Sequence, residues 1–329
     1  AFYIVISYFA VKKAKFGQYL LAAVALLPIT IQQVASLSYD VFFFLSIFCA
    51  FSYATNLWTR KEPLKLKDWL ILLGLSVFLY ISKASAISMI LLFAILPTAL
   101  LGENFFAKWL ETFWQFWKKH KILASVGLTL IGLAITAVGF RNYGGLSAGL
   151  QIIFNTFGRP DINPQLDPLV TDGMIGNFSW FIFKLPSWLI MLNFAFLGLL
   201  SFYDKDIQLD TRVPVSSVII FVVNLIVTGF VLFSTWTVAS LQKADTSWIE
   251  GLQGRYYTPF LVLLSPIGVY LSKYFKISIT QNHLKKLFIF VTSFTLIYSL
   301  VLFVLYFYFY DGGRMVIPTI WQKIRDMFI

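Results

Sequence analysis

The segment from Ile249 to Phe260, IEGLQGRYYTPF, gathers polar residues between two long apolar runs. Arg255 follows two glycines, Gly251 and Gly254, and precedes Pro259, a residue type that fits the first turn of a helix. A guanidinium donates to two phosphate oxygens at once, and the free N–H groups of a helix N-terminus add further donors. The segment therefore predicts an anion-binding site, with phosphate as the favoured ligand.

Two more charged residues lie where apolar runs end. Asp40 stands at the start of one run, and Lys83 occupies the short joint ISKASAIS between two others. A charge at membrane depth costs at least about 2.5 kcal/mol on insertion scales, and it persists where it pairs or faces a polar cavity. We therefore expect Asp40, Lys83 and Arg255 to share one pocket.

Each of these residues also has a simpler interpretation. Asp40 is a residue type that caps helices and is favoured near their N-termini. Lys83 would serve only to fix the membrane orientation of the neighbouring spans, although lysine is disfavoured in outer loops. Arg255 beside Tyr256 and Tyr257 would fit an ordinary aromatic belt at the membrane interface.

The composition places the whole chain in a lipid bilayer. Of its 329 residues 59% are hydrophobic and 12% charged, and the mean hydropathy is +0.78. Apolar stretches of roughly 17 to 25 residues, the length of a spanning helix, recur without the alternation of an outer-membrane barrel. We predict one all-α polytopic domain over residues 1–329 with about ten transmembrane helices, at residues 1–11, 18–37, 40–58, 69–82, 84–101, 122–140, 178–200, 214–238, 257–272 and 287–309.

The net charge of +11 reflects membrane orientation and does not indicate a nucleic-acid partner. Most Lys and Arg residues fall in clusters on one side of the predicted spans, which is therefore cytoplasmic. These clusters comprise Lys12, Lys13 and Lys15; Arg60, Lys61, Lys65 and Lys67; Lys108, Lys118, Lys119 and Lys121; Lys205 and Arg212; and Lys273, Lys276, Lys285 and Lys286.

The segment 103–120 predicts an amphipathic helix near the cytoplasmic interface. Its large apolar residues recur at spacings of three and four, which is typical of one helix face; they are Phe106, Trp109, Leu110, Phe113 and Trp117. An interfacial anchor is favoured over a docking role.

Residues 141–177 form the longest predicted extracytoplasmic loop, and loops of this length usually have a task. A short re-entrant or surface helix is expected around residues 150–157, where the loop is apolar. Asp161, Asp167 and Asp172 are weaker candidates for acceptor or metal contact.

Several kinds of chemistry are excluded by the sequence. It contains no nucleotide-binding loop and no HExxH, GxSxG or CxxC pattern, and its single cysteine, Cys49, rules out a disulfide within the chain. His120 and His283 are both predicted on the cytoplasmic side, apart from each other, as interfacial residues.

Three stretches resemble the signature regions of the domain-of-unknown-function family 2142, predicted bacterial polytopic membrane proteins of polysaccharide loci. They are ALLPITIQQVASLSYD (25–40), GNFSWFIFKLPSWL (176–189) and IEGLQGRYYTPFLVLL (249–264), and the run KASAISMILLFAILP around Lys83 fits as well. The resemblance implies a fold like that of type C (GT-C) glycosyltransferases, which take sugar from a polyprenyl-phosphate donor at the outer face.

The resemblance also indicates two departures. An acidic residue in the first outer loop usually serves as base or metal ligand in that superfamily, and we expect that loop and the helix before it to precede Ala1. Near the seventh predicted span the family favours an acid before the proline, whereas this chain has FKLP with Lys184.

The function implied is transfer of a lipid-linked sugar in cell-surface polysaccharide assembly in the bacterial plasma membrane. Arg255 and Lys83 would bind the lipid phosphate. Asp40 would act as the base or would orient the group that does. Tyr256, Tyr257 and Gln253 would contact the sugar or lie at the membrane interface. The expected partners are membrane lipid, a polyprenyl-phosphate sugar, a polysaccharide acceptor and other polysaccharide-assembly proteins. A divalent cation requirement stays open. The alternatives are a transporter or flippase for lipid-linked oligosaccharide and a non-catalytic scaffold subunit.

Overall fold

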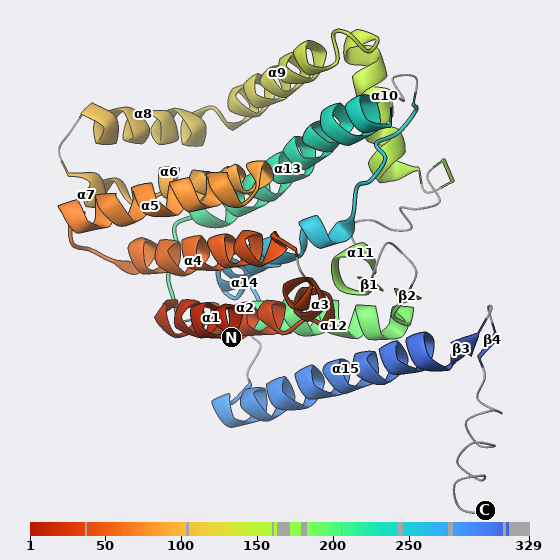
Figure 1. Ribbon diagram of the computed structural model, residues 1–329. Coiled ribbons are helices and arrows are strands. Elements are labelled where there is room, and N and C mark those ends of the chain that lie inside the picture. Colours follow the sequence, from red (N-terminus) through yellow and green to blue (C-terminus); the bar gives the residue numbers. More distant parts are fainter. Residues whose placement is uncertain are drawn as a thin grey trace, which may run out of the picture.

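The computed structural model describes residues 1–36, 38–102, 105–159, 161–162, 172–178, 183–204, 206–241, 246–275, 279–311 and 314–315. Helices dominate this part of the chain (Figure 1). In chain order they are α1 Phe2–Lys13, α2 Gln18–Ala25, α3 Pro28–Ala35, α4 Asp40–Thr59, α5 Leu66–Ser82, the 3-10 helix η1 Ala84–Ile90, α6 Leu91–Ala94, α7 Thr98–Leu101, α8 Phe105–Lys119, α9 Lys121–Gly139, α10 Gly145–Gly158, α11 Asp172–Ile175, α12 Ser187–Ser201, α13 Arg212–Leu232, the π-helix η3 Phe233–Ser240, the 3-10 helices η4 Gly254–Tyr256 and η5 Thr258–Leu263, α14 Leu264–Leu271 and α15 Gln281–Phe309.

Two pairs of very short antiparallel strands lie at one end of the molecule. β1 (Asn177–Phe178) pairs with β2 (Phe183–Lys184), with Asn177 opposite Lys184. β3 (Tyr310–Asp311) pairs with β4 (Arg314–Met315) after the end of α15. Both pairs lie at the right of Figure 1, the end to which α5 and α13 run.

The number of membrane-spanning helices is smaller than the ten predicted. Among the described residues four helices are long and apolar enough to cross a membrane, Asp40–Thr59, Lys121–Gly139, Arg212–Ala239 and Gln281–Tyr306, or five if the bent pair α2 and α3 forms one span. The other predicted spans are shorter or broken: α1 has 12 residues, α12 has 15, and residues 84–101 divide among η1, α6 and α7.

Helix breaks explain this correction. A helix of 15 residues is about 22 Å long, less than the roughly 30 Å of hydrocarbon in a bilayer. Pro28 begins α3 after a 56° bend from α2, and Pro97 precedes α7. Because proline removes a backbone donor and clashes with the preceding turn, these runs stay apolar without staying one helix.

The aromatic-rich helix α4 forms the centre of the packed bundle. Phe43, Phe44, Phe48 and Phe51 are each no more than 1% exposed. Helices in lipid associate through close packing and interhelical hydrogen bonds rather than through the hydrophobic effect. One such bond joins Ser46 Oγ to the Ser82 hydroxyl at the end of α5, at 2.9 Å.

Segment 103–120 forms the helix α8, as predicted, although its buried face differs in part from the expected one, and its place at a membrane interface stays a prediction. Ala107, Leu110 and Trp114 are buried, whereas Trp109 is 54% exposed. Figure 1 shows α8 and α9 at the edge of the bundle, and none of the residues of α9 is buried. This edge therefore presents an apolar surface suited to lipid.

The helix expected within residues 141–177 is present as α10, longer than predicted, and it begins after Gly144 in the left-handed conformation, at φ 91°. Asn155 and Thr156 of α10 hold the segment before the QGRYYTP motif. Asn155 Nδ2 donates to the carbonyl of Ser247 at 2.9 Å, and Thr156 Oγ1 accepts from the N–H of Ile249 at 2.9 Å.

Candidate functional site

Three segments far apart in the sequence bring their charged residues together at one end of the bundle. Lys83 Nζ lies 3.6 Å from Asp40 Oδ1 and 3.6 Å from the centre of the Tyr256 ring. The guanidinium carbon of Arg255 lies 5.6 Å from the centre of the same ring. Asp40, Lys83, Arg255 and Tyr256 are called the outer cluster below. The structure thus brings the three charges together around the Tyr256 ring, and the pocket that they were expected to share stays a prediction.

The local backbone explains how Asp40 and Lys83 reach the cluster. Asp40 is the first residue of α4, where the helix dipole favours an acid, and its N–H donates to Ser38 Oγ at 3.1 Å. The N-cap of α4 is Tyr39 and not Asp40, so N-capping does not account for the aspartate. Lys83 ends α5 in an extended conformation, φ −168° and ψ 135°, before η1 begins.

The QGRYYTP segment does begin a helix, as predicted, but the helix is of the 3-10 type. Gln253 is extended before η4, Pro259 lies in the first turn of η5, and only then does α14 follow. Gly251 has φ 76°, and a Cβ there would lie 2.6 Å from Cδ1 of Trp236. The first glycine is therefore required both by conformation and by space.

The short helix α11 packs directly against η4. A Cβ on Gly173 would lie 3.1 Å from the Cα of Gly254, so the two backbones come into close contact. Thr258 Oγ1 donates to the carbonyl of Met174 at 2.6 Å. The helix α11 thus packs against the segment that carries Arg255 and fixes its position.

Two nitrogens of positively charged side chains in the outer cluster have no hydrogen-bond acceptor. The side chains of Lys83 and Asp40 are 17% and 8% exposed. Lys83 Nζ and Arg255 Nε are buried without a hydrogen-bond partner, and 3.6 Å from the carboxylate exceeds hydrogen-bond distance. A buried unsatisfied donor costs about 1 to 3 kcal/mol, and more when it is charged. Two cations around one carboxylate are therefore suited to binding an anion that carries several oxygens.

Two aromatic residues near Lys83 were not identified from the sequence. Lys83 Nζ lies 4.9 Å from the ring centre of Phe43 and 5.8 Å from that of Tyr39. Ring faces attract cations, most strongly where water is excluded. The available signal was the aromatic residues on either side of Asp40 at the start of α4.

The two neighbouring tyrosines occupy different environments. Tyr257 is 0% exposed, and its ring centre lies 6.4 Å from that of Phe221 in the core. The prediction of a sugar-stacking or interfacial role for Tyr257 is therefore wrong for this structure. Gln253 is also buried, at 7% exposed, and its carbonyl accepts from the N–H of Tyr256 at 3.1 Å.

A second lysine and aspartate pair lies on the α11 side of η4. Lys184 Nζ forms an ion pair with Asp172 Oδ2, and Asp172 is buried at the start of α11. The cation at the position where an acid was expected thus neutralises a nearby acid. This pairing brings two of the weaker candidates together beside the Arg255 segment.

The remaining weaker candidates do not join the cluster. Asp161 pairs with Arg159 at 2.6 Å on an exposed surface, with side chains 62% and 45% exposed. Asp167 lies outside the described residues. Within the part of the chain that the structure describes, no three His, Cys, Asp or Glu side chains converge on a metal position.

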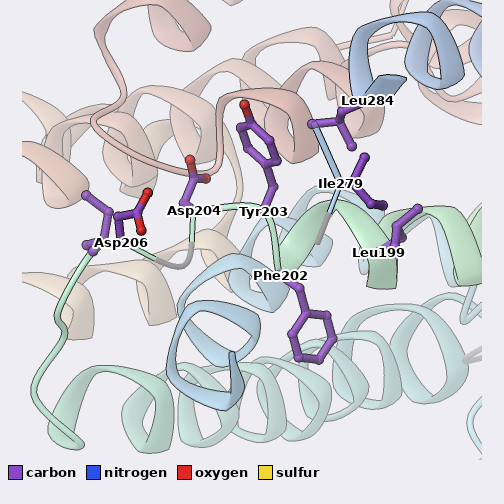
Figure 2. Close-up of a pocket in the computed structure, with 8 residues that line it drawn as sticks. Leu199, Phe202, Tyr203, Asp204, Asp206, Ile279 and Leu284 are labelled. Atoms are coloured by element: carbon purple, nitrogen blue, oxygen red, sulfur yellow. The ribbon is translucent and has the colours of Figure 1, made fainter. Parts of the chain in front are cut away.

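A cavity of about 320 Å³ with a mixed polar and apolar lining lies at the opposite end, beyond the C-terminus of α12 (Figure 2). Figure 2 shows Tyr203, Asp204 and Asp206 on the loop that follows this helix. Asp204 Oδ2 accepts from the N–H of Gly17 at 2.7 Å, just before α2 begins. Burial raises the pKa of the Asp204 carboxyl, and the charge of Asp206 adds to this effect. By accepting the hydrogen bond from Gly17, Asp204 fixes the start of α2.

A family model described as predicted membrane protein (DUF2142) matches residues 1–264. The chain belongs to this family. No curated protein and no solved structure matches the chain. The match includes every residue of the outer cluster in this DUF2142 protein, and its long apolar helices agree with a membrane protein.

Proposed function

We propose that this DUF2142 protein is a glycosyltransferase of the bacterial plasma membrane. It would take sugar from a polyprenyl-phosphate-linked donor at the outer face for the assembly of a cell-surface polysaccharide. The observation that supports this most is the pair of buried cationic groups, Lys83 Nζ and Arg255 Nε, that lack acceptors beside a single carboxylate. A lipid phosphate supplies oxygen acceptors for both.

The position of the cluster favours a lipid-linked ligand over a free one. Asp40 begins a spanning helix and Lys83 ends α5, so the charges lie where apolar helices reach the membrane surface. A phosphate bound there would have its isoprenoid chain in the bilayer and its sugar on the aqueous side. The partly buried ring of Tyr256 would lie beside the sugar.

The transfer step follows from these positions. The acceptor hydroxyl oxygen attacks the anomeric carbon while the bond from that carbon to the phosphate oxygen breaks. The bonding electron pair leaves with the phosphate, whose charge Arg255 and Lys83 stabilise. The hydroxyl proton goes to a carboxylate, with Asp40 as the base or as the group that orients it.

Binding of polyprenyl phosphate tests the phosphate position directly. The full chain in lipid nanodiscs is titrated with polyprenyl phosphate, with and without a sugar, and compared with Arg255→Ala. The matched control is Arg159→Ala, which removes an arginine paired on an exposed surface. We expect Arg255→Ala to bind at least about tenfold more weakly, or roughly 1.4 kcal/mol, and the control to bind as the unmodified chain does.

Two outcomes separate the parts of this proposal. Equal binding by Arg255→Ala and the unmodified chain would contradict the phosphate site. Binding that needs Arg255 without any transfer from a panel of polyprenyl-phosphate sugars would contradict the enzyme and favour a transporter or a scaffold subunit.

A further inference from the structure

The helices α1, α4 and α5 enclose a second site at the end of the bundle opposite the outer cluster. The groove has a volume of about 810 Å³. Figure 1 shows these helices close together, and α4 runs from Asp40 at the outer cluster to Thr59 at the groove. Most basic clusters lie on this side, which the lysine and arginine distribution assigns to the cytoplasm.

The groove combines an apolar floor with a basic rim. Its floor includes Phe9 of α1 and Ile71 and Leu75 of α5. Four cations line its rim, Lys13, Lys15, Arg60 and Lys67. We call this site the basic groove.

In the described part of the chain, nearby carboxylates pair with one of the four cations, Arg60, which lies 3.0 Å from Asp68 Oδ2 and 3.9 Å from Glu62 Oε2. Asp68 accepts hydrogen bonds from Arg60 Nη1 at 3.0 Å and from the Tyr53 hydroxyl at 2.8 Å. Among the described residues, Lys13, Lys15 and Lys67 form no salt bridge. The basic groove therefore carries a surplus of positive charge directly above apolar side chains.

Helix dipoles explain only part of this arrangement. Lys13 ends α1 and Arg60 follows α4, and cations at helix C-termini are favoured. Lys67 lies in the first turn of α5, where the dipole favours an acid instead. Asp68 supplies one acid in the same turn, and an anionic ligand in the basic groove would supply further negative charge.

We propose that the basic groove binds an anionic diacyl phospholipid of the cytoplasmic leaflet. The headgroup phosphate would lie among the four cations, and an acyl chain would lie along Phe9, Ile71 and Leu75. Charge complementarity selects the headgroup, because clustered lysines and arginines beside a membrane attract anionic lipids. The apolar floor selects a lipid over a free anion. This site is independent of the proposed transferase function and lies on the other side of the membrane.

The single cysteine gives a probe at this site. Cys49 lines the basic groove and is partly exposed. The full chain is placed in nanodiscs of phosphatidylcholine with rising fractions of phosphatidylglycerol, and the rate at which a small maleimide labels Cys49 is measured. Native mass spectrometry after transfer to detergent counts the lipids that stay bound. We expect phosphatidylglycerol to slow labelling about tenfold and to be retained as one lipid per chain.

A matched pair of charge-neutralised variants tests the role of the rim. The triple variant Lys13→Gln, Lys15→Gln and Lys67→Gln should lose both the protection and the retained lipid. The control variant Lys118→Gln, Lys119→Gln and Lys121→Gln removes the same charge from α8 and α9 and should keep both. Unchanged polyprenyl-phosphate binding at the outer cluster, or an unchanged melting temperature, shows that the triple variant is folded.

Three results would overturn the proposal. Protection that persists in the folded triple variant would show that the lysines do not hold the lipid. Protection by inorganic phosphate alone at comparable concentration would show an anion site without lipid selectivity. Displacement of phosphatidylglycerol by lower concentrations of polyprenyl phosphate would assign the basic groove to the isoprenoid lipid instead.

Discussion

The outer cluster and the basic groove both hold more positive than negative charge, yet they differ in how that charge meets water. In the outer cluster Lys83 and Asp40 have side chains 17% and 8% exposed, and charged nitrogens lack hydrogen-bond partners. In the basic groove Lys13, Lys15 and Lys67 are exposed. Buried charges interact strongly at short range, whereas exposed charges act over distance and are screened by salt. The first arrangement suits selection of one group at one position, and the second suits recruitment of a lipid class.

The largest expected effect comes from removing the carboxylate of the outer cluster. Asp40→Ala leaves Lys83 and Arg255 facing each other without compensation, so the free energy of unfolding should fall by about 3 kcal/mol. Thermal unfolding of the purified chain in one fixed detergent measures this change. The double variant Asp40→Ala with Lys83→Met should recover part of the loss. An unchanged free energy of unfolding in Asp40→Ala would show that the buried charges of the outer cluster do not depend on the carboxylate for stability.

Salt should separate the two regions next. Raising ionic strength from about 0.1 M to about 1 M shortens the screening length from roughly 10 Å to 3 Å. We expect phosphatidylglycerol binding at the basic groove to weaken about tenfold and polyprenyl-phosphate binding at the outer cluster to change less than about twofold. Titrations at both salt concentrations in the same nanodiscs compare the sites. An equal salt dependence would show that the charges of the outer cluster are screened as strongly as those of the basic groove.

A buried carboxylate at the end of the bundle opposite the outer cluster tests whether burial or position in the bundle determines how a charge affects stability. Burial raises the pKa of Asp204, so the folded chain holds that proton more tightly than the unfolded chain does. The free energy of unfolding should therefore fall as pH rises from the ordinary aspartate pKa, about 3.9, through the raised value, and then level off. Melting temperatures across this pH range measure the dependence.

Two substitutions at the same position sharpen that test. Asp204→Asn keeps an oxygen acceptor for the N–H of Gly17 and should lose the pH dependence while remaining at least as stable near pH 7. Asp204→Ala removes the acceptor and should cost about 1 to 2 kcal/mol. A pH dependence that survives in Asp204→Asn would assign it to another group.

The smallest effect belongs to a pair whose acid is more exposed than Asp40, with the Glu111 side chain 36% exposed and that of Arg212 12% exposed. Glu111 Oε1 of α8 lies 3.3 Å from Arg212 Nη2, and hydrogen bonds from Arg212 lower the pKa of the Glu111 carboxyl. Its stabilisation is present above the ordinary glutamate pKa, about 4.3, and is lost as pH falls through the lowered value. Glu111→Gln should cost at most about 1 kcal/mol, because the Glu111 side chain is 36% exposed and the amide keeps one oxygen that accepts from Arg212. A loss as large as that of Asp40→Ala would contradict the importance of burial.

The sequence was sufficient for the class of fold and for the charges that meet. Charged residues at the ends of apolar runs are costly to insert, so Asp40, Lys83 and Arg255 could be expected to pair across helices. The sequence was not sufficient for the number of spans, because apolar composition continues across breaks such as the one before Pro28. It also did not distinguish Tyr256 from Tyr257. Consecutive residues of a 3-10 turn point about 120° apart, and only tertiary packing decides which one is buried.

Contacts between distant segments were the least accessible from sequence. The ion pair of Asp172 with Lys184 depends on the pairing of β1 with β2, and the close contact of Gly173 with Gly254 depends on α11 packing against η4. The basic groove likewise needs three helices side by side. No periodic pattern in one segment encodes such positions.

The order of the outer cluster along the chain has a consequence for membrane insertion. Asp40 and Lys83 flank α4 and α5, which are consecutive in the chain, whereas Arg255 follows much later. During synthesis the aspartate and the lysine emerge together, and each offsets the cost of placing the other at the membrane. The guanidinium arrives only after α13 is made, so the cluster first assembles as a nearly neutral pair. Its capacity to attract an anion is therefore acquired late, after α1 to α13 are made and before α14 and α15 follow.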